Sequence, residues 1–97
     1  MTKRSLVVQH REAILALAAK HRATEVRLFG SVARGDERAE SDIDFLVKFD
    51  GGGTLRQLCG LAEDLEALLG CKVDLITEHP WMKPRFRANI AGDLMPV

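Results

Sequence analysis

The chain is poor in several residue types, and each shortage excludes a class of protein. Its 97 residues include no tyrosine, one tryptophan and two cysteines, and its 14 basic residues balance 14 acidic ones. Cys59 and Cys71 do not form a Cys-x-x-Cys pair, so we expect two reduced, partly buried thiols rather than a disulfide. Because neither charge predominates, no broad basic surface is expected for duplex nucleic acid or an anionic membrane.

Long hydrophobic runs are also missing. Polar residues from Gln9 to Glu12 interrupt the N-terminal segment, which excludes a signal-peptide core and a membrane span there. The protein is therefore interpreted as cytoplasmic. With an apolar fraction of 46%, a chain of this length is expected to form a single domain over residues 1–97 with a small core.

What the sequence does contain is an alternation of helical and extended segments. Helices are predicted at residues 5–20, capped by Ser5, and at 54–69 and 84–91, and strands at 25–29, 41–49 and 71–77. The middle helix has the clearest signals, because Thr54 and Gln57 are spaced as a capping box and Gly70 follows its last residue. Its apolar side is expected to contain Leu55, Leu58, Ala62, Leu65 and Leu69. This order of elements predicts an α+β fold with a small mixed sheet backed by helices.

Two aspartates interrupt the second predicted strand. Side chains alternate across a strand, so Asp42 and Asp44 share one face, while Ile43 and Phe45 point to the other, which we expect to be the core. Carboxylates at such positions lie about 7 Å apart at their backbones, close enough to hold a pair of divalent cations. These hard oxygen ligands suit Mg²⁺ or Mn²⁺. The alternative is that both are solvated carboxylates at an exposed strand start.

A glycine-serine pair ends the first predicted strand. The segment from Gly30 to Arg34, followed by Gly35, is typical of one short helical turn. Gly30 would let a phosphate approach the backbone, Ser31 offers a hydroxyl, and the free amides of the turn favour an anion. The chain has no G-x-x-x-x-G-K-[ST] sequence, so this is not a P-loop. An ordinary tight turn capped by Ser31 is the alternative.

Asp74 interrupts the third predicted strand in the same way. Its neighbours Val73 and Leu75 are expected to face the core, which turns Asp74 to the opposite side. If this strand lies beside the second one, Asp74 can join Asp42 and Asp44, and a third carboxylate near a metal can take the proton of an attacking hydroxyl. Alternatively, Asp74 is a charge that protects a strand edge from aggregation.

Together, Gly30-Ser31, ten further residues, Asp42-x-Asp44 and the later Asp74 resemble the signature of the DNA polymerase β-type nucleotidyltransferase superfamily. The flanking sequence is similar to one group within it, the minimal nucleotidyltransferases, which are MntA-like antitoxins encoded beside HEPN-domain toxins. The similarity runs from the first predicted helix to the last and covers nearly the whole chain.

The resemblance implies a role for each of these residues. Asp42 and Asp44 would hold two Mg²⁺ ions, with Mn²⁺ as a substitute, that bind the triphosphate of ATP. Gly30 and Ser31 would hold the β- and γ-phosphates. Asp74 would bind the catalytic metal and help to deprotonate the acceptor.

Four charged residues between these motifs are interpreted separately. Arg34 is expected either to add a phosphate contact or to be a solvated loop residue. The acidic residues that follow it are interpreted as solubilising, and they are Asp36, Glu37 and Glu40.

The resemblance also implies a reaction and a partner. In this group, AMP is transferred from ATP to a tyrosine of the HEPN ribonuclease, which silences that toxin. Because 97 residues leave no room for an acceptor-binding domain, the partner is expected to bring its own recognition surface. It would dock on an apolar patch of Trp81, Met82 and Phe86, although Phe86 is more readily interpreted as core. Neither nucleic acid nor membrane is an expected partner, and a homo-oligomer stays open.

Two other functions stay open as well. The chain can neutralise a HEPN partner by occlusion, with a nucleotide site that is vestigial, or it can transfer a nucleotide to an antibiotic or another small molecule. The intact set of Gly30, Ser31, Asp42, Asp44 and Asp74 favours catalysis over occlusion, because an unused cluster of like charges costs stability. The missing acceptor domain argues against a small-molecule acceptor.

Overall fold

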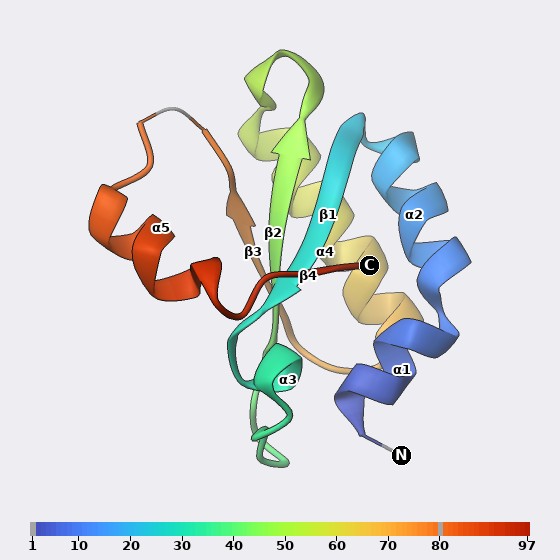
Figure 1. Cartoon of the computed structure of the whole chain (residues 1–97). Coiled ribbons are helices and arrows are strands. Elements are labelled where there is room, and N and C mark those ends of the chain that lie inside the picture. Colours follow the sequence, from blue (N-terminus) through green and yellow to red (C-terminus); the bar gives the residue numbers. More distant parts are fainter. Residues whose placement is uncertain (1, 80) are drawn as a thin grey trace.

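The chain folds as a four-stranded sheet with helices packed on it (Figure 1). The structure is a computed structural model that describes residues 2–79 and 81–97. The elements in chain order are α1 (Lys3–Gln9), α2 (Arg11–Lys20), β1 (Ala23–Phe29), α3 (Gly30–Arg34), β2 (Ile43–Phe49), the 3₁₀ turn η1 (Asp50–Gly52), α4 (Leu55–Leu69), β3 (Val73–Thr77), α5 (Pro84–Ala91) and β4 (Met95–Pro96). The predicted α+β class is confirmed.

The sheet is mixed, as the sequence predicts, and its strands lie in the order β3-β2-β1-β4. Strand β1 pairs antiparallel with β2, with Phe29 opposite Asp44. Strand β2 pairs parallel with β3, with Ile43 beside Val73. A parallel pair requires a long crossover, and α4 supplies it between β2 and β3. Asp44 therefore lies between β1 and β3 at the start of a central strand.

The larger part of the core lies on the face of the sheet that α1, α2 and α4 cover. Along β2, the side chains of Ile43, Phe45 and Val47 are fully buried on this face, as the alternation of the sequence predicts. A second, smaller cluster lies on the other face, next to α5, and consists of Phe29, Leu46, Met82 and Ile90. The face that carries Asp44 is thus partly covered as well, which the sequence analysis did not anticipate.

The first predicted helix is in fact two helices. Helix α1 is capped by Thr2, whose hydroxyl accepts a hydrogen bond from the Ser5 N–H (3.0 Å), so Ser5 is inside the helix rather than its cap. The chain leaves helical geometry at His10 (φ −101°, ψ 18°), where the ring Nδ1 donates to the carbonyl oxygen of Leu6 (2.9 Å). Helix α2 then starts at Arg11.

Helix α4 has the predicted ends but a different buried side. Its capping box is present, with Thr54 and Gln57 each bonding the other's backbone N–H, and Gly70 ends the helix in the left-handed conformation. The fully buried side chains include Leu61, which the predicted seam omitted. Leu55 is 76% exposed, because it belongs to the first turn of the helix and does not reach the core.

The strands differ from the predicted ones in their bounds and in the presence of a short fourth strand. Strands β2 and β3 start two residues later than predicted, while β1 starts two residues earlier. The C-terminal residues, expected only as an apolar tail, form β4 against β1, with Met95 opposite Leu28.

Cys59 and Cys71 are free thiols, and Cys59 is exposed rather than partly buried. Within the described parts of the chain, no helix has the length and hydrophobicity that a membrane crossing requires.

Candidate active site

Helix α3 forms the short turn predicted between the first two strands. Gly30 opens it with a φ of 78°, and Gly35 ends it with a φ of 81°. Val32 and Ala33 are buried and hold the turn against the sheet. The N–H of Gly35 donates to the carbonyl oxygen of Ser31 (2.9 Å). The start of this turn is therefore fixed at the end of β1, beside the start of β2.

Gly30 is in direct contact with the carboxylate of Asp44. A Cβ atom placed on Gly30 would lie 2.2 Å from Asp44 Oδ2 and 3.1 Å from its Cγ. Only a glycine leaves room for this carboxylate, and only a glycine adopts the positive φ without strain. The approach of a phosphate to Gly30 stays a prediction, and among the atoms of this structure the Asp44 carboxylate lies nearest to an added Cβ.

The three predicted carboxylates lie at one end of two neighbouring strands. Asp44 and Asp74 are direct partners in the parallel pairing of β2 and β3, where strands are about 4.8 Å apart. Asp42 is the last residue before β2. Asp42 and Asp44 are half-buried, and Asp74 is exposed. The expectation that a neighbouring strand brings Asp74 beside Asp44 is confirmed by this register.

The electrostatics of this group single out Asp44. The pKa of Asp44 is raised from 3.8 to about 6, mainly by burial and in smaller part by the negative charges of Asp74 and Asp42. The positive charge of Arg34 opposes this rise. The carboxylates repel one another, and the neighbouring guanidinium offsets only part of that repulsion.

This charge pattern fits a bound cation. Carboxylate oxygens are the ligands that Mg²⁺ and Mn²⁺ prefer, and a cation would relieve the repulsion that raises the pKa of Asp44. In residues 2–79 and 81–97, no group of three or more His, Cys, Asp and Glu side chains is already arranged to hold a metal ion. The fit thus rests on the chemistry of the donors and on the pairing of Asp44 with Asp74.

Arg34 connects the α3 turn to the C-terminal part of the chain. Its Nη1 lies 2.8 Å from Asp93 Oδ2, and its Nε lies 3.1 Å from Asp36 Oδ2. Asp93 follows α5, so this ion pair links α3 to the segment between α5 and β4. Arg34 is half exposed and close enough to Asp44 to lower its pKa. It is therefore an exposed, ion-paired residue at the end of α3 beside the carboxylates, and its contact with a phosphate stays a prediction.

A contact that the sequence analysis missed holds the loop before Asp42. Both carboxylate oxygens of Glu37 accept hydrogen bonds from the backbone N–H of Lys3 at the start of α1 (3.1 Å each). The Lys3 ammonium donates to the carbonyl oxygens of Ala39 (2.9 Å) and Ser41. Glu37 is thus structural, and not only solubilising. These residues are more than 30 positions apart, so no local sequence signal could reveal the contact.

The residues predicted to form a docking patch divide between surface and core. Trp81 is 86% exposed, whereas Met82 is buried in the cluster near α5. Phe86 packs against this cluster, with its ring edge-on to that of Phe29 at a centroid distance of 6.2 Å. Phe86 is thus partly buried against the smaller core cluster, as predicted.

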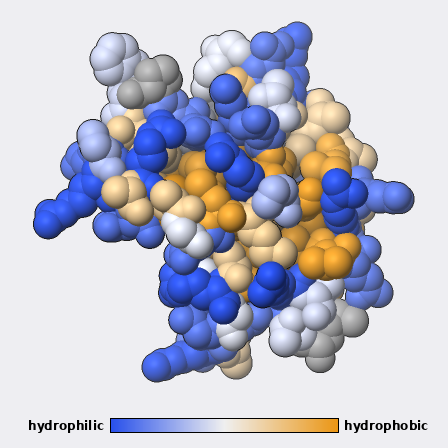
Figure 2. Space-filling view, viewed as in Figure 1, coloured by the Kyte–Doolittle hydropathy of each residue, from blue (hydrophilic) through white to orange (hydrophobic). Residues whose placement is uncertain are grey.

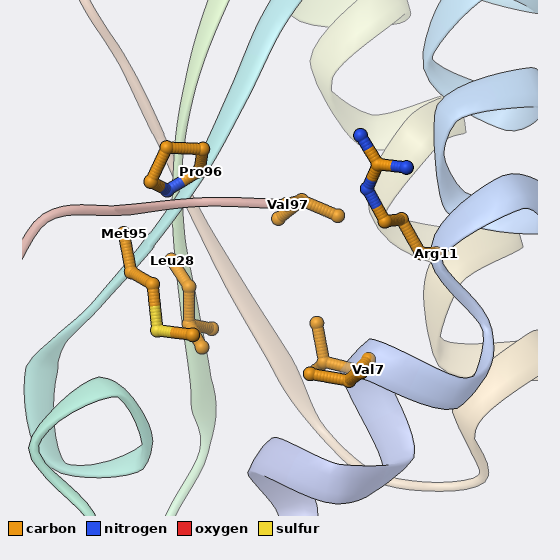
Figure 3. A pocket seen from close by; sticks show the side chains of 7 residues that line it. Val7, Arg11, Leu28, Met95, Pro96 and Val97 are labelled. Atoms are coloured by element: carbon orange, nitrogen blue, oxygen red, sulfur yellow. The ribbon is translucent and has the colours of Figure 1, made fainter.

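A separate apolar hollow lies at the opposite edge of the sheet, between α1, the first residue of α2 and β4 (Figure 3). Val7 and Leu28 line it from the large core, and Met95 and Val97 line it from the C-terminal segment. None of the site carboxylates contributes to its lining. We therefore do not include this hollow in the candidate active site.

Comparisons with known proteins agree with this geometry. The sequence model of the nucleotidyltransferase domain family matches residues 10–94. A protein of Methanocaldococcus jannaschii, named as a candidate protein adenylyltransferase, is 41% identical over 80 residues, which cover 80% of each chain. Protein adenylyltransferase MntA of Thermococcus cleftensis is 39% identical over 71 residues, which cover 73% of this chain and 67% of that one.

Two solved structures are similar to the fold. One, assigned to the minimal nucleotidyltransferases, has a TM-score of 0.83 and 43% identity, and the match covers 100% of this chain and 97% of that chain. The other, a toxin-antitoxin crystal structure with AMP-PNP, has a TM-score of 0.60 and 28% identity, over 68% of this chain and 55% of that chain. The family match spans most of the chain, and the chain therefore belongs to the nucleotidyltransferase domain family.

Proposed function

We propose that this chain is a Mg²⁺-dependent protein adenylyltransferase that transfers AMP from ATP to a tyrosine of a HEPN-domain toxin, and that it acts as the antitoxin of that pair. The observation that carries the proposal is the placement of Asp44, which contacts Gly30 of the α3 turn on one side and pairs with Asp74 on the other. The names of the adenylyltransferase relatives and the AMP-PNP of the toxin-antitoxin structure support the donor and the partner.

In this proposal each predicted residue has a defined role. Asp42, Asp44 and Asp74 would hold the Mg²⁺ ions, or Mn²⁺ in their place, and the bound ions would supply positive charge against the triphosphate. Gly30 and Ser31 would donate their backbone N–H groups to the β- and γ-phosphates at the start of α3. Arg34 borders the same group and would offset part of the phosphate charge. We propose that residues 1–97 act as one minimal domain.

The chemical step requires a base on the acceptor side. The tyrosine oxygen forms a bond to the α-phosphorus, the bond between that phosphorus and the bridging oxygen of the β-phosphate breaks, and pyrophosphate leaves. The hydroxyl proton goes to Asp74, which is exposed and so can be reached by the side chain of another protein. The chain has no tyrosine and cannot be its own tyrosine acceptor. We place this reaction in the cytoplasm, where its donor ATP is found.

The test combines the protein, Mg²⁺, ATP labelled at the α-phosphate and the HEPN-domain protein encoded beside it. We expect label on the HEPN protein, and we expect Asp44→Asn to lower the rate about 1,000-fold because it removes a carboxylate that would hold the Mg²⁺ ions, whose positive charge would stabilise the transferring phosphoryl group. Asp50→Asn is the matched control, since Asp50 is exposed beyond the other end of β2, and it should leave the rate unchanged.

One outcome would favour occlusion over catalysis. If the variant with both Asp42→Asn and Asp44→Asn still neutralises the toxin fully, and no label ever appears on the toxin, then the chain acts as a binding antitoxin. Label on the wild-type partner that disappears with Asp44→Asn but not with Asp50→Asn supports the transfer reaction.

A further inference from the structure

An exposed tryptophan stands at the edge of a shallow hydrophobic hollow beside β3. Trp81, which is the single tryptophan of the chain, is 86% exposed. The hollow is lined by Ile76 from β3, by Met82 and Lys83 from the loop before α5, and by Phe86 from α5. In Figure 2, hydrophobic surface lies between α5 and β2. We call Ile76, Trp81, Met82 and Phe86 the Trp81 patch.

The Trp81 patch rests on the core. Met82 is buried against Phe29, Leu46 and Ile90, and its N–H donates to the carbonyl oxygen of His79 (3.1 Å). The ring of Phe86 packs edge-on against Phe29. These contacts fix Met82 and Phe86, whereas the indole of Trp81 itself stays on the surface at the rim of the hollow. An exposed tryptophan beside a packed apolar hollow is typical of a binding anchor.

The patch lies on the side of the active site from which an acceptor must approach. Asp74 and Ile76 are two residues apart on β3 and so share one face of the sheet. The α3 turn, which would hold the phosphates, lies on the β1 side of Asp44, and Asp74 lies on the β3 side. A hydroxyl that gives its proton to Asp74 therefore arrives over β3, next to the Trp81 patch.

On its α5 side, the patch is bordered mainly by positive charges. Glu78 is the one acidic residue among residues 76–87. Its carboxylate is already bound by Arg27 and by Arg87 (3.1 Å). Lys83 lines the hollow, Arg85 follows two residues later in α5, and neither forms an ion pair with another described residue. A partner segment with acidic residues would complement these cations, whereas the neutral ring of a nucleotide base would not need them.

We propose that the Trp81 patch binds the acceptor protein through a segment that places an apolar side chain on Trp81 and acidic side chains beside Lys83 and Arg85. The inference rests on the proposed transfer to a protein acceptor and names the surface that such an acceptor uses. Binding of the adenine ring to Trp81 is the competing occupant, and the test separates the two.

The experiment measures steady-state transfer of labelled AMP to the HEPN-domain partner, with KM determined separately for the partner and for ATP. We expect Trp81→Ala and Lys83→Glu each to raise the KM for the partner about tenfold, with the KM for ATP unchanged. Trp81→Phe should retain most of the affinity, because it keeps an aromatic ring. The matched controls are Leu55→Ala and Arg56→Glu, which remove an exposed apolar side chain and an exposed cation at the start of α4 and should change neither KM.

An unchanged KM for the partner in both Trp81→Ala and Lys83→Glu overturns the inference, and so does a rise confined to the KM for ATP, which would assign the patch to the base.

If the wild type transfers no AMP at all, the proposed function fails, and the patch is then tested by binding alone. Trp81 is the chain's sole tryptophan, so its emission in the Asp44→Asn variant should shift to shorter wavelength when a tryptophan-free partner variant binds. Binding without that shift, or no binding, overturns the inference.

Discussion

The two faces of strand β2 have different roles, although their residues alternate along a single segment. Ile43, Phe45 and Val47 are fully buried under the helices, while Asp44 on the opposite face contacts Gly30 and pairs with Asp74. The buried face supplies the stability that holds β1, β2 and β3 in register. The opposite face uses that register to bring charges together, which opposes folding unless something neutralises them. Substitutions on the two faces should therefore change different measurements.

The largest effect is expected on the buried face. Phe45→Ala removes a fully buried ring from the centre of the core and should lower the free energy of unfolding by about 3 to 5 kcal/mol. Denaturant unfolding followed by circular dichroism measures this loss. Lys48→Ala, an exposed residue of the same strand, is the control and should change stability by less than about 0.5 kcal/mol. Equal effects of the two substitutions would contradict the assignment of the faces.

On the charged face, a substitution of Gly30 acts directly on the Asp44 carboxylate. Gly30→Ala would place a methyl group 2.2 Å from Asp44 Oδ2, so the carboxylate must move, and we expect transfer to fall about 100-fold. Gly35→Ala is a matched control, since Gly35 has a similar φ of 81° but no atom within 4 Å of an added Cβ. Both variants should lose about 1 kcal/mol from backbone strain, and only Gly30→Ala should lose activity.

A smaller effect is expected at Arg34. Its charge lowers the pKa of Asp44, so Arg34→Gln should raise that pKa and shift the acid limb of the pH profile of kcat/KM to higher pH. At pH 8 the loss of activity should be roughly tenfold or less. Arg38→Gln, an exposed arginine of the following loop, should leave the profile in place. A profile that does not move with Arg34→Gln would show that Arg34 does not act on Asp44.

The smallest effect is expected where the loop before Asp42 meets α1. Glu37→Gln weakens the two hydrogen bonds from the Lys3 N–H at a helix start and should cost about 0.5 to 1 kcal/mol of stability. Glu40→Gln, in the same loop and exposed, should be neutral. Thermal unfolding at low salt compares them, and a similar loss in both would mean that the Glu37 contact has no structural role.

The parts of the site that sequence could predict are those with a local pattern. The alternation of Ile43, Asp44 and Phe45 fixes which side chains face the core, and Gly35 marks the end of the α3 turn. The same alternation around Asp74 placed its side chain correctly, and the parallel register then brought it beside Asp44. Short-range rules suffice for the side of the strand that each residue faces and for the end of the turn, because these depend only on neighbouring residues.

The features that sequence could not predict all depend on distant residues. The contact of Gly30 with Asp44 and the bond from Lys3 to Glu37 join segments whose packing is set by the whole fold. Strand β4 has only two residues, too few for any alternation to show. The burial of Leu46 depends on α5 covering the face that carries Asp44. Tertiary packing decides these features, and local propensity does not.

The proton affinity of Asp44 gives the most direct test of the charged face. Its pKa is about 6 in the folded protein against 3.8 ordinarily, so the folded state binds the proton more tightly. Stability therefore falls as pH rises from about 4 to 6, and the cost is fully present above pH 6. The full shift corresponds to about 3 kcal/mol, and solvent screening of this half-buried group reduces it to about 1 kcal/mol.

The decisive measurement is the free energy of unfolding of the wild type and of Asp44→Asn at pH 8, without ligand and with Mg²⁺ plus a non-hydrolysable ATP analogue. Without ligand, Asp44→Asn should be the more stable protein by about 1 kcal/mol, and the difference should vanish near pH 4. With ligand at about 100 times its Kd, the wild type should gain about 2.7 kcal/mol and become the more stable of the two, while Asp44→Asn gains little. A wild type that is already more stable without ligand, or an equal gain in both proteins, would contradict the account.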